Sequence, residues 1–208
     1  MFSERSHFER TEEPLDRELA KCDFLSLNDK ADILLMAEGR KKASIISMIG
    51  IWEDPAAWER FERNEAHLQR VLNGAHLPYD LFRERDGRFV LVNFEVGSDA
   101  TAMEELRAVR NIEEGPERAV AMGKLFGFPD TAIRGYLEER KKDNKDLPEE
   151  VRASAAMPFL NFRLSEDHWR DEWKSVEERA AAVRSLAPET YRLSLREGED
   201  ASGMSSGK

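Results

Sequence analysis

The chain has 208 residues, a 40% hydrophobic share and a formal net charge of −10, from 32 Lys and Arg against 42 Asp and Glu. That hydrophobic share excludes a wholly disordered chain, and no apolar run approaches the roughly 20 residues that span a bilayer. A single cysteine, Cys22, excludes an intramolecular disulfide and a cysteine-cluster metal site. We therefore expect a soluble, cytoplasmic, acidic protein, whose charge argues against a general nucleic-acid coat.

The two ends of the chain differ in pattern from its middle. Residues 1–27 are mixed in charge and lack a sustained apolar stripe, which predicts a loosely ordered amino-terminal arm. Residues 28–195 are predicted to form a single domain. After Arg196 the composition turns to Gly, Ser and acidic residues, and this change predicts a disordered tail over 196–208.

The first half of the predicted domain combines helices with a small sheet. A branched, apolar run over 43–50 predicts a buried strand. An Asp-Pro pair then opens an amphipathic helix over 55–74. Residues 79–96 predict a β-hairpin that turns at Asp86-Gly87, because glycine supplies the positive φ that a tight turn needs.

The second half is predicted to be mostly helical. Helices are expected over 99–112, 116–126 and 130–142, in a short stretch from 148, and from a Ser165 cap onward. Residues 158–163 have an extended pattern that predicts an edge strand. This order of elements predicts an α+β fold, with a small sheet and hairpin in the first half covered by a mostly helical second half.

The sequence offers no pattern for a metal or a cofactor. No two histidines have the i, i+4 spacing that would place them together on a helix to hold zinc. They are His7, His67, His76 and His168. None neighbours Cys22 in the sequence, so we predict no structural metal. Because no Walker loop, dinucleotide fingerprint or nucleophile elbow is present, neither a cofactor nor a catalytic residue is predicted.

The segment over 122–133 is the most unusual stretch. Gly127 is suited to end one helix in the left-handed conformation, and the Pro-Asp pair after it is suited to start the next. Unpaired backbone N–H groups at the start of a helix favour an anionic guest. We therefore predict a small-molecule site, for an anionic ligand or an enzymatic reaction, at this corner. Its candidate ligand-binding residues are Gly127, Phe128, Pro129, Asp130, Thr131 and Arg134.

Other interpretations compete with this site. In a structural interpretation, Asp130 caps the second helix and pairs with Arg134 at i, i+4. In an alternative function, residues 118–142 form a DNA-binding helix-turn-helix. A third hypothesis is an acidic protein-interaction module. The basic run over 40–42 suits a phosphate or an acidic partner, and equally suits a solvated strand entrance.

One segment resembles a known family. Residues 123–132, Gly-Lys-Leu-Phe-Gly-Phe-Pro-Asp-Thr-Ala, resemble the Leu-Gly-x-Leu-Leu-Gly-Tyr-Pro-x-Cys-Cys motif of an uncharacterised archaeal and bacterial domain family. Residues 159–191 are similar to its carboxy-terminal stretch, and the resemblance covers about residues 75–195. Thr131 and Ala132 stand at the positions of the paired cysteines, so any metal or redox chemistry of those cysteines is absent here. The resemblance implies a fold and carries no activity.

Overall fold

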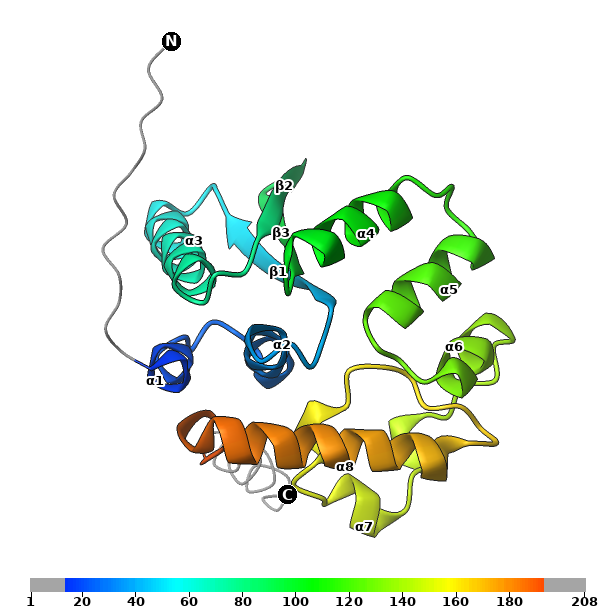
Figure 1. The fold of residues 1–208 in the computed structure, drawn as a ribbon. Coiled ribbons are helices and arrows are strands. Elements are labelled where there is room, and N and C mark those ends of the chain that lie inside the picture. Colours follow the sequence, from blue (N-terminus) through cyan, green and yellow to red (C-terminus); the bar gives the residue numbers. More distant parts are fainter. Residues whose placement is uncertain (1–13, 193–208) are drawn as a thin grey trace, which may run out of the picture.

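The computed structural model describes residues 14–192, which form an α+β fold (Figure 1). Its elements in chain order are α1 (Leu15–Ala20), α2 (Leu27–Ala37), β1 (Ala43–Ile51), α3 (Pro55–Gly74), β2 (Tyr79–Asp86), β3 (Phe89–Gly97), α4 (Ala100–Arg110), α5 (Pro116–Leu125), α6 (Asp130–Leu137), η1 (Asn144–Asp146), α7 (Glu149–Arg152), η2 (Met157–Phe159) and α8 (Trp169–Leu186). The predicted fold class is therefore confirmed. Within residues 14–192, no helix has the length and apolar character needed to cross a membrane.

The three strands form one antiparallel sheet in the order β1–β3–β2. β2 and β3 are the predicted hairpin, in which Asp86 pairs with Phe89. The loop between them consists of Gly87 and Arg88, one residue later than the predicted Asp-Gly turn. Gly87 has a φ of 54°, a conformation that glycine adopts without a Cβ clash.

The two faces of the sheet meet different layers, since alternate residues of a strand point to opposite sides. On one face, Ile46 and Phe94 are fully buried in the main core, against which α2 and α3 pack. On the other face, α4 covers one end, where its Met103 clusters with Ala43. The remainder of that face leaves large apolar side chains exposed: Ile49, Phe82 and Phe89.

The later helices are attached to the first half through α2 and α4. α5 packs between α4 and α6, while α8 lies along α2 and also contacts α6 (Figure 1). Trp173 and Val176 of α8 join the same core cluster as the sheet, together with Phe159 of η2. The α5–α6 corner is therefore held beside α2 and α8, and this position decides what the corner can face.

α6 is shorter than the helix predicted to run to residue 142. It ends at Leu137, because Glu139 takes a positive φ of 56° and the Arg140 N–H donates to the Gly135 carbonyl oxygen at 2.8 Å. A left-handed residue with this hydrogen bond terminates an α-helix. The charged residues after Leu137 therefore follow the helix and do not extend its face.

The edge strand predicted over 158–163 is wrong. Met157–Phe159 instead form a 3-10 turn, and the chain continues as a loop. Phe159 is fully buried and stacks on Tyr191, with ring centroids 5.8 Å apart. Among the described residues the sheet consists of β1, β3 and β2, and this segment is not part of it.

The ordered domain begins before the predicted residue 28. Leu19 and Cys22 are fully buried in the main core, and Leu25 is nearly so. The six-residue helix α1 is too short to show apolar periodicity, which is why the sequence predicts a loose arm there. The rest of that arm, residues 1–13, and the predicted tail over 196–208 lie outside the described residues.

Candidate functional site

The α5–α6 corner has the geometry that the sequence predicts. α5 ends at Leu125, Gly127 takes a φ of 76°, and α6 begins at Asp130. The backbone N–H of Phe128 donates to the carbonyl oxygen of Gly123 at 2.9 Å. This bond closes the end of α5 around the left-handed glycine, so the chain reverses sharply before α6.

α5 and α6 approach each other closely at Gly123. A Cβ at this position would lie 2.8 Å from Cγ1 of Ile133, closer than packed side chains allow. The missing side chain therefore lets Ile133 pack directly on α5. The close packing fixes the relative position of the two helices and of the hollows beside them.

The predicted anion-site residues face three separate hollows. Gly127 lines one hollow and Phe128 lines a second. Thr131 and Arg134 line a third, which lies between α6 and the residues before α8. The corner therefore does not bring its predicted ligand-binding side chains together around one space.

The amino end of α6 is not capped as predicted. Pro129 occupies the cap position without a side-chain capping hydrogen bond, and Asp130 is the first helical residue. Within residues 14–192, Arg134 forms no ion pair with Asp130. Because Asp130 places a carboxylate in the first turn, its charge disfavours a second anion at this helix end.

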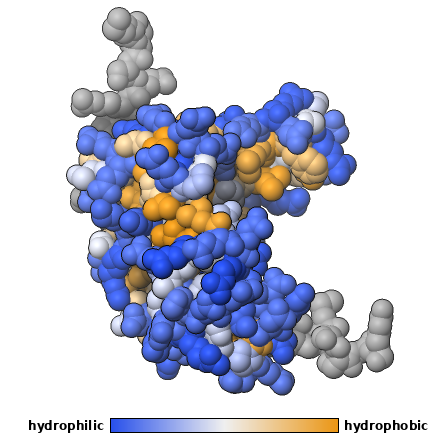
Figure 2. Space-filling model, turned by 90° about the vertical axis from the view of Figure 1, so that its right-hand side faces the viewer, coloured by the Kyte–Doolittle hydropathy of each residue, from blue (hydrophilic) through white to orange (hydrophobic). Residues whose placement is uncertain are grey.

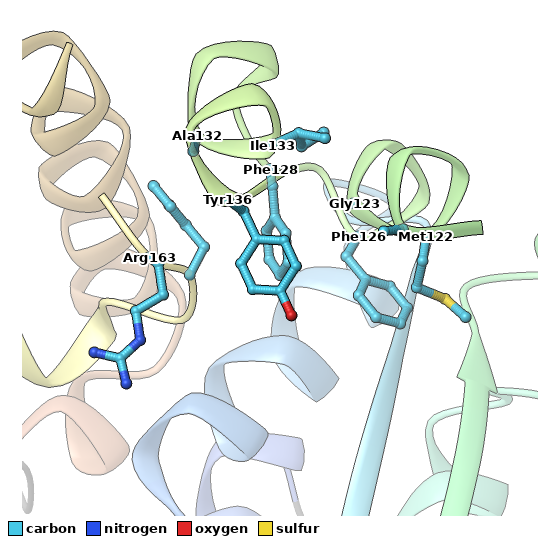
Figure 3. Close-up of a pocket in the computed structure, with 10 residues that line it drawn as sticks. Met122, Gly123, Phe126, Phe128, Ala132, Ile133, Tyr136 and Arg163 are labelled. Carbon is cyan, nitrogen blue, oxygen red and sulfur yellow. The ribbon is translucent and has the colours of Figure 1, made fainter. Parts of the chain in front are cut away.

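An apolar groove of about 350 Å³ lies beside the corner. Side chains of α5, α6 and the loop before α8 line it: Met122, Phe126, Phe128, Ile133, Tyr136 and Phe162. Figure 3 shows Tyr136 and Phe128 extending into the space below α6, with Arg163 at its edge. Tyr136 is 53% exposed. On the side of the molecule where α5 and α6 lie, hydrophobic residues gather near the centre around a hollow (Figure 2).

A second hollow, of about 480 Å³, also borders Phe126. We call it the basic cavity, because five cationic side chains line it against one acidic side chain, Glu178. The cations are Arg40, Lys41, Lys42, Lys124 and Arg179. Lys42 pairs with Glu105 at 2.9 Å, whereas Arg40 and Lys124 are exposed cations at the same hollow.

Two of the cations that line the basic cavity, Lys41 and Arg179, share one buried carboxylate, that of Asp32. The Asp32 carboxylate lies 3.0 Å from Nζ of Lys41 and 2.7 Å from a terminal nitrogen of Arg179. It also accepts a hydrogen bond from the Ser44 hydroxyl. Burial lowers the pKa of the Lys41 ammonium, although the Asp32 carboxylate beside it acts in the opposite direction. Nε of Arg179 is buried without a hydrogen-bond partner among the described residues.

The groove and the basic cavity share an aromatic boundary. Phe126 and Phe162 line both hollows. The Phe128 ring joins them, with its centroid 5.9 Å from that of Phe126 and 5.6 Å from that of Phe162. Nζ of Lys41 lies 5.8 Å from the centroids of Phe126 and Phe128 and donates to the Phe126 carbonyl oxygen at 3.1 Å. A charged group and an apolar surface therefore meet at this boundary.

The helix-turn-helix hypothesis needs a basic face around α6. Arg140 pairs with Asp167 at 2.5 Å, and Lys124 lines the basic cavity on the side of α5. Arg134 lies in the third hollow, which also contains acidic side chains. Arg134 and Arg140 therefore share a hollow with the carboxylates of Glu138, Glu166 and Asp167, and Lys124 lies at a different hollow.

The fold creates one cluster that the sequence analysis missed. Sγ of Cys22 lies 3.9 Å from Nε2 of His67, and a Glu18 carboxylate oxygen lies 3.6 Å from the same nitrogen. A catalytic Cys-His-acid arrangement needs the acid on the other ring nitrogen. Burial also raises the pKa of the Cys22 thiol to about 11, which keeps it protonated at neutral pH. This cluster is therefore unsuited to nucleophilic catalysis.

No group of three or more His, Cys, Asp and Glu side chains within residues 14–192 could hold a metal ion. The absence of a structural metal stays a prediction that elemental analysis of chelator-washed protein tests. Comparisons with models of known protein families, with curated proteins and with solved structures found no match. The resemblance over 75–195 likewise stays a prediction.

Proposed function

We propose that the protein binds an anionic small molecule in the basic cavity. One observation carries this proposal: five cationic side chains and a single acidic one line a hollow of about 480 Å³. A volume of this size is within the range of small-molecule sites, which are about 300–1,000 Å³. The anionic ligand predicted for the corner is thus assigned to the basic cavity, which Gly127 lines, and not to the hollow that Thr131 and Arg134 line.

The electrostatics of the basic cavity support an anion. Lys41 and Arg179 are both close to Asp32, so a buried and a half-buried cation share one carboxylate. Because burial penalises a charge that lacks a full set of partners, an incoming anion would stabilise the charged form of Lys41. Arg40 and Lys124 also line the cavity and are exposed. The planar guanidinium of Arg40 and the ammonium of Lys124 add hydrogen-bond donors for an anion.

We assign no reaction to this site, since the residues that line the basic cavity include no activated nucleophile or acid–base pair. The proposed function is therefore binding, and a cytoplasmic location is proposed with it. The single cysteine supports that location, because the chain cannot form an intramolecular disulfide.

Titration calorimetry with inorganic phosphate and with citrate tests the proposal. We expect saturable binding to the native protein, and at least about ten-fold weaker binding after the double substitution Arg40→Gln and Lys124→Gln. Both residues are exposed, so the fold should survive their exchange. A cation outside the cavity supplies the matched control: Arg134→Ala should bind as the native protein does.

The outcomes separate the competing sites. If Arg134→Ala abolishes binding while the double variant retains it, the anion binds at the amino end of α6 and the proposal is overturned. Absence of binding for both anions would also overturn it. Specific binding of a short DNA duplex that depends on Arg134 would favour the helix-turn-helix hypothesis instead.

A further inference from the structure

The groove and the basic cavity are neighbours, because Phe126 and Phe162 line both of them. We infer that the ligand is an amphipathic anion, whose head lies in the basic cavity and whose apolar chain lies in the groove. The inference rests on the proposed function, because it takes the anion site as given and names the class of molecule that fills it.

The lining of the groove defines the apolar part of the ligand. Its walls are the side chains of two helices and one loop, and nearly all of them are aromatic or aliphatic. The phenol group of Tyr136 and the guanidinium of Arg163 are the polar side-chain groups that line it. A groove of about 350 Å³ with this lining suits a hydrocarbon chain or an aryl group, since burying apolar surface drives binding.

The charges close to the shared boundary define the head. The Lys41 ammonium lies 5.8 Å from the centroids of the Phe126 and Phe128 rings, so a cation lies close to the aromatic side chains of the groove. A ligand that is apolar throughout would leave the basic cavity unused. A small inorganic anion would leave the groove exposed to water, together with Tyr136 at 53% exposure. An anionic head joined to an apolar chain is complementary to both hollows.

A series of linear carboxylates tests this inference: acetate, butyrate, hexanoate, octanoate and decanoate, each kept below its micelle-forming concentration. We expect the affinity of the native protein to rise about four-fold for each added methylene group, which is the effect of burying one CH₂. The rise should stop once the chain fills the groove. Affinities come from calorimetry, with inorganic phosphate as the headgroup-only probe.

Two matched variants on α5 locate the chain. Ala119 is half-buried and lines the groove, so Ala119→Phe should fill the space and remove the chain-length dependence. Binding of phosphate and acetate should remain unchanged in this variant. Ala121→Phe is the control, since Ala121 is also half-buried on α5 and does not line the groove. It should retain the full chain-length dependence.

The outcomes distinguish this inference from the proposed function. Phosphate binding without any dependence on chain length would overturn the inference and leave the anion site intact. A chain-length dependence that survives Ala119→Phe would overturn the placement in the groove. If neither phosphate nor any carboxylate binds, the proposed function itself fails. The protein could instead fail to bind the free carboxylates and sediment with vesicles of phosphatidylcholine and phosphatidylglycerol. That result would assign the surface to membrane binding and also overturn the inference.

Discussion

The ammonium of Lys41 is buried, so protein groups and not solvent stabilise its charge. Its side chain is 6% exposed, and its ammonium has the Asp32 carboxylate and the Phe126 carbonyl oxygen as partners. Burial nevertheless lowers its pKa. Arg179 also contacts Asp32, at 2.7 Å, so it competes with Lys41 for the same carboxylate. Lys41 is therefore the cation in the basic cavity that a bound anion would stabilise most.

Cys22 gives a prediction at the same scale. Its thiol is fully buried, and burial raises its pKa to about 11 from an ordinary 9.0. Because the thiolate is the reactive form, two pKa units reduce its population about 100-fold at pH 8. We expect a thiol-exchange reagent to label the folded protein at least about 100-fold more slowly than the protein unfolded in guanidinium. Equal labelling rates would contradict both the burial and the raised pKa.

Single residues also show what a sequence can reveal about a site. Gly127 is predictable, because a glycine before a Pro-Asp pair is a local signal for a helix end and a helix start. The ion pairs of Asp32 with Lys41 and Arg179 join α2, the loop that follows it and α8. No regular sequence spacing predicts such contacts. The basic run over 40–42 is visible in the sequence, but its carboxylate partner and its cavity arise only from packing.

At the scale of elements, the hairpin is specified by its turn, and Gly87 carries a testable prediction. It is the first of the two loop residues and has a φ of 54°. A β-branched residue is strained there, so Gly87→Val should lower the free energy of unfolding by about 1–2 kcal/mol, measured by urea denaturation. No atom lies within 4 Å of a Cβ at this position, so the expected loss is conformational and not a clash.

The matched control for this prediction is Gly87→Asn. Asparagine tolerates positive φ in hairpin turns better than other residues do. It should therefore retain more of the stability than Gly87→Val. Equal unfolding midpoints for the two variants would show that the backbone conformation at Gly87 does not limit the stability of the hairpin.

Elements with a long, regular pattern are the ones that the sequence predicts well. α3 begins at the expected Asp54 cap, whose carboxylate accepts from Ala56 at 3.0 Å and Ala57 at 3.1 Å, and it ends at Gly74. The prediction fails where tertiary contacts decide. The loop over 160–163 lacks a partner strand, although its residues have an extended pattern. Its side chains line the candidate site instead of extending the sheet.

At the scale of the whole molecule, the two ends of the described chain are joined. α1 lies beside the carboxyl end of α8 (Figure 1). The Asp16 carboxylate accepts hydrogen bonds from the backbone N–H groups of Glu189 at 3.0 Å and Thr190 at 2.9 Å, and from the Thr190 hydroxyl at 2.7 Å. Residues 188–192 are helical, so Asp16 caps the start of a helix from a distant part of the sequence. No local pattern could reveal this contact.

The last prediction concerns this contact between the ends. Asp16→Ala removes a charged acceptor from the backbone N–H groups of Glu189 and Thr190, while the hydroxyl of Thr190 keeps the Asp16 carbonyl oxygen at 3.3 Å. We expect the free energy of unfolding to fall by about 2–3 kcal/mol, because hydrogen bonds to charged groups are strong and buried donors are costly to leave unpaired. Asp99→Ala is the matched control, since Asp99 caps α4 locally through Ala102 at 2.8 Å and its loss costs about 1 kcal/mol. Both values come from urea denaturation followed by circular dichroism. An Asp16→Ala protein as stable as Asp99→Ala would show that the contact between the ends contributes no more than a local helix cap.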